Sequence, residues 1–324
     1  MRESQIIERL RRIATAPGAR GLLDDVAVLE GFVVTHDTIA EGVHFLPHDP
    51  PASVGWKLVA VNLSDLAAKG ATPAGALLSL TIAGPGEWEQ TFLGGVEAAC
   101  ESYGLPLLGG DTIALPPASP RVLGLTAFGR AGTRVPDRAG AAGDALWLVG
   151  TIGDAAAGLA LLTGDRNADG PLVDIYRRPI PQLGAGQALA PHAHAMMDVS
   201  DGLLLDAKRM ADASRCGIHI ELDALPLSSA FVAERGQDRA ARLFAATGGD
   251  DYALLTALRP DLDPETLSLP NRTRISRIGE LVAGQRGISL THAGEPVELP
   301  ETLGFEHQGP ENSGLPVPPM DDRP

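Results

Sequence analysis

The chain alternates between short apolar runs and longer stretches with helical spacing, and glycine or proline residues separate them. Apolar runs of strand length predict strands at 26–29, 32–35, 76–82, 105–108 and 122–129. Helical spacing predicts helices at 53–69, after Pro50-Pro51, and at 88–103, before Gly104. This order of strands and helices indicates an α/β fold of the α+β type.

The composition changes to glycine, arginine, proline and aspartate between residues 130 and 144, where we place a domain boundary. Beyond it, strands are expected at 145–149, 195–199, 217–222 and 251–258, and helices at 155–163, 182–189 and 203–214. We therefore expect an N-terminal α/β domain over 1–135 and a C-terminal α/β domain over 136–307, whose mixed sheet is flanked by helices. Residues 308–324 are rich in proline, glycine and aspartate, which predicts a disordered tail.

The overall composition argues against several classes of protein. A formal net charge of −15 is a poor match to a nucleic acid, which needs a basic surface. No apolar stretch approaches the roughly 18 uncharged residues of a membrane span, and residues 1–17 have the pattern of an amphipathic helix. The two cysteines, Cys100 and Cys216, have no metal-ligand spacing, which fits a reducing compartment. We expect a cytoplasmic protein that binds neither nucleic acid nor membrane.

Lysine is rare in this chain, which contains only Lys57, Lys69 and Lys208. None of them lies in a Gly-x-x-x-x-Gly-Lys-Ser/Thr loop, so a Walker-type nucleotide site is excluded. Any phosphate would have to be bound by metal ions, arginines and backbone amides. The turn at 150–154 follows a strand and opens a helix, which makes it a weak candidate for binding a phosphate.

Aspartates recur where apolar runs break at glycine, serine or threonine, which in α/β folds is the end of a strand, where sites form. These positions are Asp24-Asp25, Asp37, Asp111, Asp198 with Asp201, and Asp250-Asp251. Asp65 differs, because it lies within the helix predicted at 53–69 and on its apolar face. A carboxylate buried there needs a cation as partner, unless that helix is more exposed than its pattern indicates.

Carboxylates without clusters of histidine or cysteine favour Mg²⁺ over zinc or copper. Each aspartate taken alone can be a helix cap or a turn residue, but so many in one pattern favour a shared metal site. The residues by themselves therefore indicate a metal-dependent phosphate chemistry and leave the substrate open.

Four motifs resemble those of the thiamine-monophosphate kinases, a family within the superfamily of aminoimidazole ribonucleotide synthetases. They are Val61–Ala71 (VNLSDLAAKGA), Gly109-Gly110-Asp111-Thr112, Asp198-Val199-Ser200-Asp201-Gly202-Leu203 and Gly248-Gly249-Asp250-Asp251-Tyr252. The order and spacing match from Gly21 to Phe305, so the resemblance covers nearly the whole chain. The first and third motifs together are specific, whereas Gly-Gly-Asp recurs across the superfamily.

The resemblance implies an enzyme that transfers the γ-phosphoryl group of ATP to thiamine monophosphate, the final step of thiamine diphosphate biosynthesis, with several Mg²⁺ ions as cofactors. It also implies a homodimer in which two N-terminal domains pair their sheets, with ATP between the two domains of one subunit. The metal contacts that it implies are Asp25, Thr35, Asp37, Asp65, Asp111, Asp198 and Asp201. The implied ATP contacts are Tyr103, Gly110, Asp111, Arg138 and Ser200, and the implied substrate contacts are His44, Asp250 and Phe305.

The sequence departs from the family pattern at three places. Gly21-Leu22-Leu23 precedes the first aspartate pair where the family has Gly-x-Gly, which removes backbone freedom at that turn. His36 stands where a threonine metal contact is common, which puts that contact in question. Asp250 replaces a usual glutamate and is one methylene shorter, which puts its reach to the substrate in question.

The resemblance indicates direct in-line transfer without a phosphoenzyme, because the acceptor phosphate is already mostly ionised at neutral pH and needs no strong general base. Other interpretations stay open: an aminoimidazole ribonucleotide synthetase, a metal-dependent phosphatase, or a non-catalytic nucleotide-binding regulatory protein on the same fold. Selenophosphate synthetase is disfavoured because the first cysteine is Cys100. The carbamoyl-transferring hydrogenase maturation protein is disfavoured because that family ends in cysteine, whereas this chain ends in Pro324.

Overall fold

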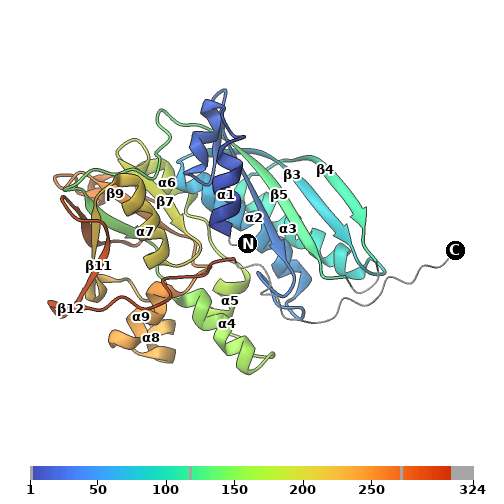
Figure 1. Ribbon diagram of the computed structural model, residues 1–324. Coiled ribbons are helices and arrows are strands. Elements are labelled where there is room, and N and C mark those ends of the chain that lie inside the picture. The colour runs from blue at the N-terminus through green and yellow to red at the C-terminus, as the bar shows by residue number, and fades with distance from the viewer. Residues whose placement is uncertain (1–2, 117–118, 271–272, 308–324) are drawn as a thin grey trace.

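The computed structural model describes residues 3–116, 119–270 and 273–307, and each half of this described chain forms one β-sheet (Figure 1). The first sheet has the strand order β1-β2-β5-β3-β4, and the second has the order β12-β11-β8-β10-β6-β9-β7. Both sheets contain parallel and antiparallel neighbours. The predicted α/β class with a mixed C-terminal sheet is therefore confirmed. The tail predicted at 308–324 lies outside the described residues.

The N-terminal half begins with two short helices, and the first sheet and two long helices follow. The helices are α1 (Glu3–Arg11), η1 (Pro17–Leu22), α2 (Pro51–Ala68) and α3 (Glu87–Tyr103). The strands are β1 (Ala27–Leu29), β2 (Phe32–Ala40), β3 (Thr72–Ile82), β4 (Leu107–Ala114) and β5 (Val122–Arg130). β3, β4 and β5 extend to the right of Figure 1, with β4 at the edge of the sheet.

The second half alternates strands and helices before it ends in strands. Its helices are α4 (Asp154–Gly164), α5 (Pro171–Arg177), α6 (Leu183–Leu189), α7 (Leu203–Ser214), η2 (Leu222–Ala224), α8 (Ser229–Arg235), α9 (Arg239–Thr247) and η3 (Pro264–Thr266). Its strands are β6 (Ala145–Val149), β7 (Ala195–Val199), β8 (Gly217–Glu221), β9 (Ala253–Leu258), β10 (Ile275–Val282), β11 (Gly287–His292) and β12 (Glu295–Val297). The sequence pattern did not predict α5, α8, α9 or the strands β10 to β12. The boundary expected at 135/136 falls in the segment between β5 and β6, and its position stays a prediction.

Helix α2 joins the two halves through apolar packing. Its residues Ala67 and Ala68 belong to one buried cluster with Leu189 of α6 and Met196 of β7. The two backbones are so close that a Cβ atom on Gly186 of α6 would lie 1.9 Å from the carbonyl oxygen of Ala67, which is why a residue without a side chain stands there. None of the described helices is long and apolar enough to cross a membrane.

Strands β2 and β4 are longer than their apolar runs predict. β2 stays paired with β5 up to Ala40, and Asp37 lies opposite Leu125 in that pair. β4 stays paired with β3 up to Ala114, so Asp111 lies within the strand. The expectation that these aspartates follow strand ends is therefore wrong for Asp37 and Asp111, because the backbone hydrogen bonds continue where the apolar pattern stops.

Candidate active site

A cavity of about 530 Å³ lies between the two halves. The N-terminal half contributes residues of β2, of the loop after it and of α2, and the second half contributes residues of α4, β7, α7 and the loop before β9. Most of the site residues predicted from the sequence line it: Asp25, Asp37, Asp65, Asp198, Asp201, Arg138, Ser200, His44, Asp250 and Phe305. The tertiary structure thus brings together residues that lie far apart along the chain.

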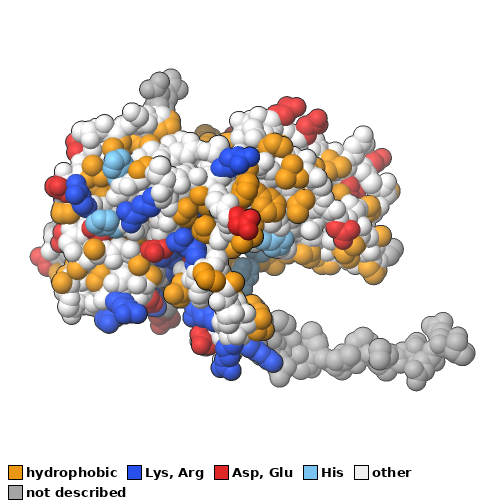
Figure 2. Space-filling model, turned by 90° about the horizontal axis from the view of Figure 1, so that it is seen from above, with side chains coloured by type: hydrophobic (Ala, Val, Ile, Leu, Met, Phe, Trp, Pro, Cys, Tyr) orange, Lys and Arg blue, Asp and Glu red, His pale blue; other side chains and the backbone are white. Residues whose placement is uncertain are grey.

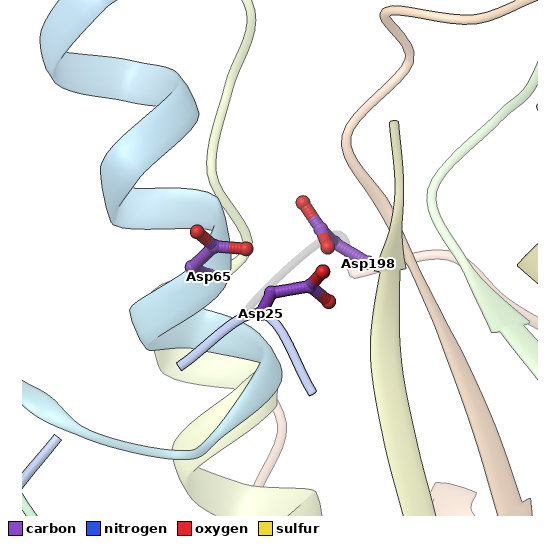
Figure 3. Close-up of side chains that lie close together, drawn as sticks. All are labelled: Asp25, Asp65 and Asp198. Atoms are coloured by element: carbon purple, nitrogen blue, oxygen red, sulfur yellow. The ribbon is translucent and has the colours of Figure 1, made fainter. Parts of the chain in front are cut away.

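At one end of the cavity, three carboxylates point toward one another (Figure 3). Asp25 comes from the loop before β1, Asp65 from α2 and Asp198 from β7. One oxygen of each lies within 4.8 Å of the others. Ligand oxygens around one Mg²⁺ ion are about 3–4 Å apart, so a small inward movement would let these three share an ion. We call these three carboxylates, with the neighbouring Asp37 and Asp201, the acid end of the cavity.

Asp65 and Asp198 are buried, and hydroxyl groups are their hydrogen-bond donors. The Thr35 hydroxyl donates to Asp65, and the Ser64 hydroxyl donates to Asp198 at 2.7 Å. Within the described residues, neither carboxylate forms an ion pair with lysine, arginine or histidine. The suggestion that the helix leaves Asp65 exposed is therefore wrong, and the cation that its burial calls for does not come from this part of the chain.

The pKa values reflect this shortage of positive charge. Burial, followed by the charges of Asp37 and Asp198, raises the pKa of Asp65 well above its usual value. Burial and the Asp25 charge raise the pKa of Asp198 to about 7. Burial and the charges of Asp25 and Asp201 raise the pKa of Asp37 to about 7. Clustered carboxylates that resist ionisation, with oxygen as the sole donor atom, fit a site for Mg²⁺.

Asp25 differs from its neighbours because cations surround it. Loss of contact with bulk water in the cavity would raise its pKa, but Arg138, Lys69 and Arg209 lower the pKa below its usual value. Arg138 forms an ion pair with the Asp25 carboxylate. The preceding Asp24 anchors the loop, because its carboxylate lies 2.7 Å from the Lys69 ammonium and 2.9 Å from the Arg20 guanidinium. Asp24 therefore holds Asp25 in place.

Arg209 of α7 organises the other side of the acid end. Its guanidinium lies 2.6 Å from a carboxylate oxygen of Asp201 and 2.8 Å from one of Asp206. Asp206 in turn accepts hydrogen bonds from the backbone N–H groups of Ser200 and Asp201, both at 3.2 Å. This network fixes the turn between β7 and α7 that carries Ser200 and Asp201.

A second part of the cavity wall carries His44, Asp250 and aromatic rings. The Tyr252 hydroxyl donates to one oxygen of Asp250 at 3.0 Å, and the Lys57 ammonium donates to the other at 2.7 Å. His44 accepts a hydrogen bond from the backbone N–H of Ala40 on Nδ1, and burial lowers its pKa, so the neutral ring carries its proton on Nε2. Phe305 lines the cavity and is half exposed. We call this the acceptor end.

The turn at 150–154, a weak candidate for phosphate binding, is already used within the protein. The carboxylate of Asp251 accepts hydrogen bonds from the backbone N–H groups of Gly153, at 2.6 Å, and Ala155, at 3.2 Å. Amides engaged in this way at the start of α4 are not free to bind a phosphate.

Comparisons with known proteins identify the family to which the chain belongs. The family model of the AIR synthase related protein N-terminal domain matches residues 23–131, and that of the C-terminal domain matches residues 141–291. The thiamine-monophosphate kinase of Caulobacter vibrioides is 36% identical over 318 residues, which cover 93% of this chain and 89% of that protein. The chain belongs to the thiamine-monophosphate kinase family.

Other members and structures extend the match to this family. The thiamine-monophosphate kinase of Escherichia coli K12 is 35% identical and covers 89% of this chain and 91% of that protein. A solved structure of AaThiL complexed with AMPPCP and TMP has a TM-score of 0.82 and 30% identity, and the match covers 95% of this chain and 97% of that one. The hydrogenase maturation protein HypE in complex with ATP, at 19% identity and a TM-score of 0.66, shares the fold.

Some residues that the family motifs single out do not line the cavity of the described chain: Thr35, Tyr103, Gly110 and Asp111. Thr35 is buried directly behind Asp65, to which it donates a hydrogen bond. Tyr103 lies at the end of α3, and Gly110 and Asp111 lie on the exposed edge strand β4. Gly110 also has a packing role, because a Cβ atom there would lie 1.9 Å from the carbonyl oxygen of Leu78.

The family motifs also left functional neighbours unnamed. Ser64 stands beside Asp65 in the first motif, so its place near the cluster could have been inferred from that adjacency. Arg209 follows Asp201 by two helical turns, which is a signal visible in the sequence. Tyr252 ends the fourth motif two residues after Asp250, so its contact with that carboxylate could also have been inferred. Lys57 gave no such signal, because only its contact with Asp250 makes it relevant.

Proposed function

We propose that this protein transfers the γ-phosphoryl group of ATP to the phosphate of thiamine monophosphate and so forms thiamine diphosphate. One observation carries the proposal: a single cavity collects clustered carboxylates, two of them buried without a paired cation among the described residues, together with an ordered acid and aromatic rings. Membership of the kinase family supports it, as does the related AaThiL complex with AMPPCP, an ATP analogue, and TMP. ATP is available in the cytoplasm, where we place the reaction.

We propose that the acid end holds Mg²⁺ through Asp25, Asp37, Asp65, Asp198 and Asp201. Mg²⁺ bound there would neutralise phosphate oxygens and so lower the repulsion between two anionic substrates. Arg138, which lies beside Asp25 on the cavity wall, would bind the polyphosphate of ATP. Ser200 would contact the nucleotide from the turn that Arg209 and Asp206 hold rigid.

We propose that the acceptor end binds thiamine monophosphate through His44, Asp250 and Phe305. Asp250 lines the cavity despite being shorter than the usual glutamate, so its side chain reaches the site. The rings of Phe305 and His307 meet edge to face, with centroids 4.9 Å apart, and offer an apolar surface to a heterocycle. Transfer is direct, because an acceptor phosphate that is already ionised needs no covalent relay.

We propose further that two chains pair through the first sheet. All eight residues of the edge strand β4 are exposed, including Leu107 at 50%, Leu108 at 62% and Ile113 at 52%. Figure 2 shows apolar side chains among the charged ones on this side of the molecule. An exposed apolar edge strand is a template for pairing with another chain. Such pairing would place Gly110 and Asp111 where two chains meet. Analytical ultracentrifugation tests it: the wild-type protein should sediment as a dimer, and the Leu108→Glu variant should sediment as a monomer.

An assay of the purified protein with ATP, Mg²⁺ and thiamine monophosphate tests the function. Chromatography of the thiamine species should show thiamine diphosphate formed in step with ADP. Free phosphate without thiamine diphosphate would indicate a phosphatase, and binding of both substrates without ADP would indicate a regulatory protein. Turnover of formylglycinamidine ribonucleotide in place of thiamine monophosphate would indicate the synthetase. A trapped phosphoprotein would contradict direct transfer.

A further inference from the structure

Lys57 is a buried lysine whose ammonium group connects three walls of the acceptor end. Its side chain is 2% exposed. The ammonium donates to an oxygen of Asp250 at 2.7 Å and to the backbone carbonyl of His44 at 2.9 Å, and it lies 4.2 Å from the centre of the Tyr176 ring. His44, Tyr176 and Asp250 line the cavity, whereas Lys57 lies behind them. Lys57 therefore contacts residues of the cavity wall but does not itself line the cavity.

The position of Lys57 on α2 relates it to the acid end. Lys57, Val61 and Asp65 follow one another at intervals of four residues, so they lie along one stripe of the helix. Val61 and Asp65 of that stripe line the cavity. At a rise of 1.5 Å per residue, Lys57 lies about 12 Å along the helix axis from Asp65. One rigid helix thus sets the spacing between the acid end and the acceptor end.

The segment that carries Asp250 needs support from outside. Asp250 and Tyr252 have φ angles of 69° and 51°, in the left-handed region that residues with side chains avoid. Backbone hydrogen bonds to Ser200 and Val199, both in the second half, hold this segment from one side. Lys57 holds it from the other half of the protein, and the Asp250 side chain is 27% exposed to the cavity.

The contacts to Asp250 also decide what it can still bind. Each of its two oxygens already accepts one hydrogen bond, from Lys57 or from the Tyr252 hydroxyl. A carboxylate has about four acceptor positions, so each oxygen retains one that an N–H donor can reach from the cavity. Its orientation is then fixed before the substrate arrives, which reduces the entropy lost on binding.

We propose that Lys57 is a positioning residue for the phosphoryl acceptor: from behind the cavity wall it fixes Asp250 and the His44 loop, and so sets the affinity for an acceptor with N–H donors. This inference rests on the proposed function. It assigns Lys57 to recognition of the acceptor and not of ATP.

The test compares Lys57→Met, Asp250→Asn and the double variant with the wild-type protein. Lys57→Met should raise the KM for thiamine monophosphate at least about tenfold, the loss expected for one charge-assisted hydrogen bond. The KM for ATP should stay within about twofold, because Lys57 lies about 12 Å along α2 from Asp65 of the acid end. Lys208→Met is the matched control, since Lys208 is exposed and pairs with Asp212 on the surface of α7.

The double variant decides whether Lys57 acts through Asp250. If it does, Lys57→Met adds less than about threefold to the KM for thiamine monophosphate once Asp250 is already asparagine. An added tenfold increase in that background, or equal changes in both KM values, would overturn the proposal. The double variant removes both charges together, so its comparison with Asp250→Asn remains decisive if Lys57→Met alone does not fold. Wild-type protein without turnover would count against the proposed function, whereas wild-type turnover with an unchanged Lys57→Met would count against this inference alone.

Discussion

Asp65 and Asp250 are carboxylates on the wall of the same cavity, and their partners differ in kind. Asp250 has a lysine ammonium on one oxygen and a tyrosine hydroxyl on the other. Asp65 is buried among other carboxylates, with the Thr35 hydroxyl as its donor. At the acceptor end, the charge of Asp250 is thus balanced by that of Lys57, whereas the acid end carries excess negative charge. Under the proposed function, the acceptor end is ordered before binding, and the acid end needs cations that bind together with the substrates.

The variant Asp65→Asn should have the largest effect and tests whether the acid end needs its negative charge. The amide keeps the shape but loses the charge that would hold Mg²⁺, so kcat should fall by about 10³-fold or more. The fold should persist, because an amide relieves repulsion among the buried carboxylates. Steady-state kinetics and circular dichroism check both expectations, with the exposed Asp212→Asn as control. Turnover close to wild type would remove Asp65 from the site.

Mg²⁺ without any substrate tests the excess of charge directly. At 100 times its Kd the ion should stabilise the wild-type protein by about 2.7 kcal/mol, seen as a rise of several degrees in Tm. The rise should be much smaller in Asp65→Asn, because one of the clustered ligands has lost its charge. Thermal unfolding in MgCl₂ and in NaCl of equal ionic strength provides the measurement. Equal shifts in the two proteins would mean that Mg²⁺ binds elsewhere.

Arg138 is the arginine that pairs with a carboxylate of the clustered three, so it sharpens the comparison. Arg138→Met should raise the KM for ATP about 10- to 100-fold, as expected for one lost charge-assisted contact to a phosphate. The KM for thiamine monophosphate should change less, because Arg138 belongs to the acid end. Arg138→Met should thus raise mainly the KM for ATP, whereas Lys57→Met should raise mainly the KM for thiamine monophosphate. A larger increase in the KM for thiamine monophosphate than for ATP in Arg138→Met would contradict this prediction.

Replacing Asp251 should have the smallest effect, and it tests how much the hydrogen bonds next to Asp250 stabilise the fold. Asp251→Asn keeps one acceptor oxygen but loses the other, so one backbone N–H at the start of α4 is left without its partner. The free energy of unfolding should fall by about 1–2 kcal/mol. Urea denaturation measures the loss, and the exposed Asp261→Asn should leave the midpoint unchanged. A midpoint unchanged in Asp251→Asn as well would show that these hydrogen bonds do not stabilise the segment.

Local patterns predicted the regular parts of the fold. Helix α7 and the strands β6 and β7 have the bounds that apolar periodicity indicates, because their side chains pack on a single face or in a buried sheet. The periodicity also placed Asp65 on the inner face of its helix, and its burial confirms this. The strand β4 escaped prediction at its C-terminal end, since its pairing partner and not its own polarity decides where it stops.

The sequence by itself singled out the carboxylates that line the cavity, because each stands where an apolar pattern breaks or on the apolar face of a helix, but it also singled out Asp111, which lies outside the cavity on β4. Only the tertiary structure decided which of them are neutralised. Lys57 and Asp250 are separated by 193 positions, and Arg138 and Asp25 by 113, so no local pattern could pair them. The charge state of a buried group depends on what folding places within a few ångströms of it, and for Asp65 the fold places other acids there.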